Sequence, residues 1–125
     1  MEQKLEYIND GKILVRRVRG KADFDEIYCS WLDVIAKKSV KPTTIGIIND
    51  FIGAELDMKI TDVKKLISLF ESNLEVFGLL RIAVVVDSYK NIVFPMVGGK
   101  FSVKINVRPF STYESAHDWV MGFID

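Results

Sequence analysis

Cysteine and histidine are almost absent from the chain, which contains one of each, Cys29 and His117. A single cysteine cannot form an intrachain disulfide, and it excludes zinc sites built from several cysteines. An isolated thiol is typical of a reducing compartment, so we expect a cytoplasmic protein. The two residues are also the only possible Cys–His catalytic pair. Because neither stands in a catalytic signature, we predict that Cys29 packs in the core and that His117 is packed or half-exposed on its helix.

The chain also lacks a net charge and any long hydrophobic run. Its 17 basic residues balance 17 acidic ones, so no long-range attraction to nucleic acid or to anionic membranes is expected. Apolar runs such as 82–86 are too short to span a bilayer, and the alternating N-terminal residues do not form a signal peptide. No glycine-rich phosphate loop and no His-x-x-x-His pair is present. We therefore expect no cofactor, no metal, no nucleic acid and no integral membrane association.

Positive charge is concentrated locally in Arg16, Arg17 and Arg19. Alternation along a strand places Arg16 on one face and the other two on the opposite face. A patch split in this way, without interleaved aromatic residues, does not indicate a nucleic-acid site. We expect a solvated strand end that pairs with acidic neighbours.

The remaining pattern is that of one folded unit over residues 1–125, in which 49% of the residues are hydrophobic. Strands are predicted over 5–8, 12–19, 44–49, 81–87 and 104–110, with helices near 23–38, 61–74, 91–101 and 111–124. Asp10-Gly11 between the first two strands indicates an antiparallel hairpin, which Gly20 ends. The apolar run at 82–86 does not alternate, which is typical of a buried parallel strand. The order predicts an α/β fold with a mixed, mostly parallel five-stranded sheet and about four helices.

Helix starts are indicated by capping residues. Asp23 followed by Glu26 has the form of a capping box, and Ser111 followed by Glu114 repeats it. Thr61 is the predicted N-cap of the helix that follows the connection 51–60.

Four segments carry a family resemblance: YINDGKILVRRVRGKADFDEI, TIGIIND, RIAVVVD and INVRPFSTYESAHDWV. Together they resemble the SpoIIAA-like (STAS-like) family of small bacterial domains, which implies a β-α superhelix. Better-known STAS domains bind a partner kinase and are switched by phosphorylation of a serine in an Asp-Ser-Ser-Gly turn. The corresponding stretch here, 55–62, lacks that turn, and Thr61 offers its only hydroxyl. We interpret Thr61 as a plain N-cap and do not transfer the phosphorylation.

Two aspartates end predicted parallel strands, Asp50 and Asp87. Ligands of α/β sheets often lie beyond the carboxyl ends of strands, so this pair could bind a metal or share acid–base chemistry. Aspartates at such positions more often accept hydrogen bonds from turn N–H groups. We expect the second role for both aspartates. An enzyme is therefore the function that we rank lowest.

Apolar residues in two irregular segments exceed what one small core holds. We predict that both segments form a homodimer interface or line an apolar groove. The function expected is a non-catalytic regulatory or protein-interaction module that self-associates or binds a regulatory protein. The alternative is a small apolar-ligand or lipid carrier with a cavity lined by Trp31, Phe70 and Trp119. The residues of the predicted surface are Phe51, Ile52, Leu56, Met58, Phe94, Met96 and Val97.

Overall fold

The computed structural model describes residues 1–87 and 104–125. The helix expected over 91–101 lies outside the described residues, as do Phe94, Met96 and Val97 of the predicted surface.

The chain begins with the expected antiparallel hairpin. Strands β1 (Glu2–Ile8) and β2 (Ile13–Asp23) pair from Glu2 opposite Arg19 to Ile8 opposite Ile13. The connecting turn needs three left-handed residues in succession, with φ angles of 53° at Asn9, 57° at Asp10 and 82° at Gly11. Asn, Asp and Gly are the residues that adopt this conformation most easily, so the sequence fixes the turn locally.

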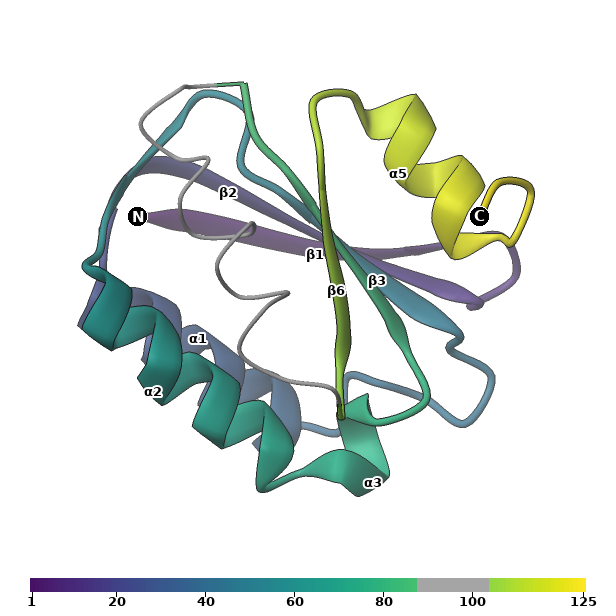
Figure 1. The fold of residues 1–125 in the computed structure, drawn as a ribbon, viewed down its shortest axis with the longest axis horizontal. Helices are drawn as coiled ribbons and strands as arrows, with labels where there is room; N and C mark the ends of the chain where they lie inside the picture. The colour runs from purple at the N-terminus through teal and green to yellow at the C-terminus, as the bar shows by residue number, and fades with distance from the viewer. Residues whose placement is uncertain (88–103) are drawn as a thin grey trace.

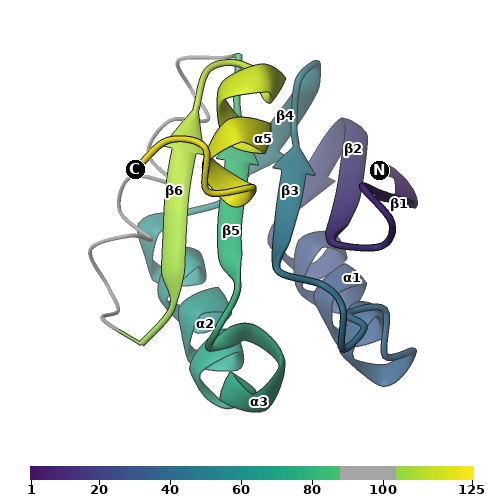
Figure 2. The same cartoon turned by 90° about the vertical axis from the view of Figure 1, so that its right-hand side faces the viewer.

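Parallel strands extend the sheet from β2. Strands β3 (Gly46–Asp50), β5 (Arg81–Val85) and β6 (Asn106–Phe110) follow in the order β1-β2-β3-β5-β6. The order along the sheet therefore repeats the order along the chain (Figure 2). Among the described strands, β6 lies at an edge of the sheet, as its proline, Pro109, predicts.

A sixth strand corrects the sequence prediction. β2 does not end at Gly20 but continues to Asp23, and its second half pairs in parallel with β4 (Ala54–Asp57). Gly20 lies within this strand at a φ of 81°, which an L side chain rarely adopts. The described sheet thus has six strands rather than five, and the stretch 51–60 contains a strand.

Helices cover the two faces of the sheet unequally (Figure 1). Helices α1 (Phe24–Ala36), α2 (Ile60–Glu71) and α3 (Leu74–Phe77) lie on one side, and α5 (Tyr113–Val120) lies on the other. β5 contributes Ile82 and Val84 to the core beneath the first group and Ala83 and Val85 to the core beneath α5. The expected burial of this strand on both faces is confirmed.

The helix starts agree with the sequence only in part. Asp23 caps α1, and its carboxylate accepts the Glu26 N–H in a capping box. α2 begins two residues earlier than expected, with Lys59 as N-cap, and Thr112 rather than Ser111 caps α5. Among the described residues, no helix combines the length and the apolar character that crossing a membrane requires.

Candidate functional site

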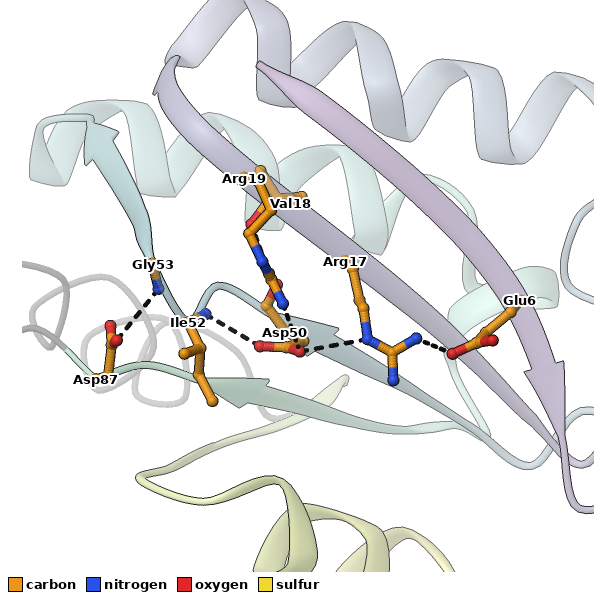
Figure 3. A network of polar contacts seen from close by, with 8 residues as sticks. All are labelled: Glu6, Arg17, Val18, Arg19, Asp50, Ile52, Gly53 and Asp87. Carbon is orange, nitrogen blue, oxygen red and sulfur yellow. Dashed lines mark hydrogen bonds and ion pairs between the residues drawn. The ribbon is translucent and has the colours of Figure 1, made fainter.

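Asp50 lies at the carboxyl edge of the sheet, where β3 ends, and its side chain is 7% exposed. Arg19 Nη2 lies 3.2 Å from its Oδ2, and Arg17 Nε lies 3.6 Å from the same oxygen. Its Oδ1 accepts the N–H of Ile52 at 3.0 Å (Figure 3). The carboxylate is therefore fully engaged by two cations and a turn, as the hydrogen-bonding interpretation predicts.

The two arginines reach Asp50 from one face of β2. Arg17 also pairs with Glu6 of β1, and Arg19 donates to the carbonyl oxygens of Val18 at 2.9 Å and Asp50 at 3.1 Å. Arg17 lies over the ring of Tyr113 at 5.8 Å. Burial raises the pKa of the Tyr113 hydroxyl, and the Arg17 charge partly opposes this rise. The expected pairing of these arginines with acidic neighbours is observed.

Asp87 does not join Asp50. Its Oδ2 accepts the N–H of Gly53 at 3.1 Å and thereby holds the turn between β3 and β4. The two carboxylates are directed to different partners in Figure 3. No group of three potential metal ligands occurs within residues 1–87 and 104–125. The geometry of both aspartates is that of turn anchors.

Arg16 is a polar core residue that sequence reasoning missed. It is 0% exposed, and burial lowers its pKa to about 9. Its guanidinium donates to Gln3 Oε1 at 2.9 Å, to Asn49 Oδ1 at 3.1 Å and to the Ser30 hydroxyl. All three acceptors are neutral, and no carboxylate forms a salt bridge with Arg16 in the described part of the chain. A fully buried cation is therefore stabilised by hydrogen bonds and by the Trp31 ring below it.

The apolar residues of the first predicted segment, 51–58, are buried or half-buried within the protomer. Phe51 is 1% exposed and packs in the core, so it is unavailable to a docking surface. Leu56 and Met58 are half-buried against the same core, and Ile52 is half-buried against the core beneath α5. β4 is the physical reason, because pairing with β2 holds this segment on the sheet.

An apolar groove of about 650 Å³ lies at the opposite, amino edge of the sheet. Its walls come from the end of α1, the loop 38–44 and the residues around α3. Leu79 stands on its rim with 99% of its side chain exposed. This groove was not predicted from the sequence, because segments that are distant in sequence form its walls. The apolar lining residues are Val34, Ile35, Val40, Pro42, Val76, Leu79 and Leu80.

Among solved structures, the chain is similar to an uncharacterised protein of the DUF3478 family from Shewanella loihica, which has a SpoIIAA-like fold. The TM-score is 0.59 at 17% sequence identity, and the match covers 95% of this chain and 92% of that one. The fold of this chain is SpoIIAA-like. The likeness carries the fold alone at this identity, and it confirms the resemblance read from the sequence motifs. No family model and no curated protein matches the chain.

Within this SpoIIAA-like fold, Thr61 does not take the position expected for it. It is exposed in the first turn of α2, and it is not the N-cap. The helix start is instead closed by Asp62, whose Oδ2 accepts the Lys59 N–H at 3.0 Å. Thr61 therefore does not have the predicted capping role.

The Cys–His pair is also separated by the SpoIIAA-like fold. Cys29 lies exposed on α1, so the prediction that it packs in the core is wrong. His117 lies on α5, on the other side of the sheet, where its Nε2 hydrogen bonds with Asn9 Nδ2 at 2.9 Å. A nucleophile and its base must be within hydrogen-bonding reach, and the sheet lies between these two.

Proposed function

We propose that the protein is a non-catalytic regulatory module of SpoIIAA-like fold that self-associates through an apolar surface. Its candidate chemical groups support this proposal because the two aspartates are engaged by other groups and the cysteine and histidine are far apart. Asp50 is held by two arginines, Asp87 holds a turn, and Cys29 and His117 lie on opposite sides of the sheet.

The observation that carries the proposal is the apolar surface left after the core is filled. Leu79 is 99% exposed and Phe123 is 67% exposed, while Ile45 is also exposed. An isolated exposed leucine is ordinary, but Leu79 borders a groove with further apolar walls. Apolar surface of this kind marks protein contacts.

Sedimentation velocity of the wild-type chain over a wide concentration range tests this function. We expect a concentration-dependent shift from monomer to dimer. A chain that sediments as a monomer at every concentration overturns the proposal.

The groove volume also favours a second candidate, a carrier of a small apolar ligand, because ligand pockets span roughly 300–1,000 Å³. The cavity expected from the sequence does not support this candidate. Trp31 packs edge-on against Phe70 with ring centres 4.9 Å apart, and Trp119 belongs to the other core. Mass spectrometry of the purified chain distinguishes the two functions: a co-purifying apolar molecule at near-equal amount favours the carrier, and its absence favours the module.

A further inference from the structure

The groove at the amino edge has both a cavity and a protruding side chain, which is what contact with an identical copy requires. Leu79 follows α3 and stands on the rim, while Leu80 beside it is buried. α3 lies at one end of the molecule, below the starts of the strands in Figure 2. We propose that two copies meet here about a two-fold axis, with Leu79 of each inserted into the groove of the other. The proposal rests on the self-association proposed above and names its surface.

An identical copy suits the groove because a two-fold axis lets each subunit use the same surface. In such an interface the same patch serves both subunits, so each must supply the projection and the hollow side by side. The groove of about 650 Å³ is much larger than one leucine, so the loop that carries Leu79 can enter together with its side chain. Burial of a fully exposed leucine on each side of the axis removes apolar surface from water and so favours association.

Charges of both signs line the groove and strengthen the argument for a second copy. Lys38 and Lys41 stand on the side of α1 and the following loop, and Glu75 stands on α3. None of the three forms a salt bridge within residues 1–87 and 104–125. A two-fold axis through the groove brings Lys41 of each copy to the α3 side of the other, opposite Glu75. An acidic partner would pair only with the two lysines, and a basic partner would pair only with Glu75.

The wall that carries Lys41 is held in place before association. Tyr7 of β1 donates its hydroxyl to the Ser39 carbonyl oxygen at 2.6 Å, and the Lys41 ammonium lies 4.2 Å from the centre of the Tyr7 ring. The Lys41 N–H donates to Thr44 Oγ1 at 3.1 Å. A wall fixed in this way loses little freedom on binding, which favours association.

The first test replaces Leu79 by aspartate. We expect Leu79→Asp to raise the dimer dissociation constant at least about tenfold, because a carboxylate replaces a buried leucine on each side. The control is Ile60→Asp, which places the same charge on an exposed apolar residue at the start of α2, and it should leave the constant unchanged. Both side chains are exposed, so the thermal midpoints of the variants should remain close to that of the wild type.

The second test exchanges the charges. Lys41→Glu and Glu75→Lys should each weaken the dimer several-fold, and the double variant should restore it because every pair is re-formed with reversed sign. If the wild-type chain dimerises but Leu79→Asp dimerises equally well, the groove is not the interface, and the proposed function stands without it. If the wild-type chain is a monomer, both proposals fail. Weakening by the single charge variants without rescue in the double variant overturns the Lys41–Glu75 pairing.

Discussion

The guanidinium carbon of Arg16 lies 4.3 Å from the centre of the Trp31 ring, in the interior between β2 and α1. The ring compensates in part for the water that the cation has lost. Asn49 links the same network to the sheet, because its amide donates to the Ala83 carbonyl oxygen at 3.0 Å. The chain thus retains a charged residue at the centre of its larger core, where a neutral one would be easier to bury.

Arg16→Lys should make stability depend on pH. The burial that lowers the pKa of Arg16 would likewise lower the pKa of a lysine at this position below its unfolded value of about 10.4. Between the folded and unfolded pKa values the folded state binds fewer protons than the unfolded state, so the free energy of unfolding rises with pH, by about 1.4 kcal/mol per unit. Denaturant unfolding at several pH values between about 6 and 9 measures this slope relative to the wild type. The control Arg17→Lys alters a half-exposed neighbour, and its stability should vary with pH as that of the wild type does. If the unfolding free energy of Arg16→Lys has the same slope against pH as that of the wild type, the burial argument is contradicted.

Tyr7→Phe should loosen the loop that forms one wall of the groove. The substitution removes the hydrogen bond to the Ser39 carbonyl and keeps the ring under Lys41, so we expect a loss of about 1 kcal/mol. Amide hydrogen exchange should become faster at Val40 and Lys41 than elsewhere. Tyr28→Phe on α1 is the matched control. Equal exchange rates in both variants would show that Tyr7 does not position the loop.

Asp50→Asn should destabilise the carboxyl edge of the sheet. The amide oxygen can still accept the Ile52 N–H, but Arg17 and Arg19 lose the negative charge between them. Because both arginines are partly exposed to solvent, we expect a loss of about 1–2 kcal/mol, smaller at high salt. Chemical denaturation at low and high salt measures it. Asp87→Asn, which alters one exposed hydrogen bond, should cost less; a larger loss there would contradict the assigned roles.

Asp23→Ala should remove the capping box of α1. The Glu26 N–H then lacks its side-chain acceptor, and a loss of about 1 kcal/mol follows. Asp25→Ala removes an acidic residue from the same first turn without touching the cap, so it serves as control. The midpoint of thermal unfolding should lie several degrees lower for Asp23→Ala than for Asp25→Ala. Equal midpoints would argue against the capping role of Asp23.

Local chemistry explains which parts of the fold could be predicted. The hairpin follows from Asn9-Asp10-Gly11, and the parallel sheet follows from the unbroken apolar run of β5. β4 was missed because Gly20 was interpreted as the end of a strand. The alternation of Ala54-Glu55-Leu56-Asp57 was the signal that could have found it.

The candidate site was predicted less well, because the burial of each side chain depends on which face of its strand or helix is covered by other elements. Alternation separated Arg16 from Arg17 correctly, but only the presence of Leu14 and Val18 on the same face indicates that Arg16 is buried. Helical phase likewise places Cys29 away from Ile27 and Trp31, which form the buried side of α1. The groove could not be predicted, since loops that are distant in sequence form its walls.

The placement of α5 has a consequence for how the protein is made. This helix lies about 100 residues after the start of β2, yet Ala116, Trp119 and Val120 supply the cover for Ile13, Val15 and Ile48. During synthesis those early side chains lack this cover until α5 itself has left the ribosome. A product truncated before Tyr113 would therefore expose an aliphatic face of the sheet, a natural substrate for chaperones and proteases.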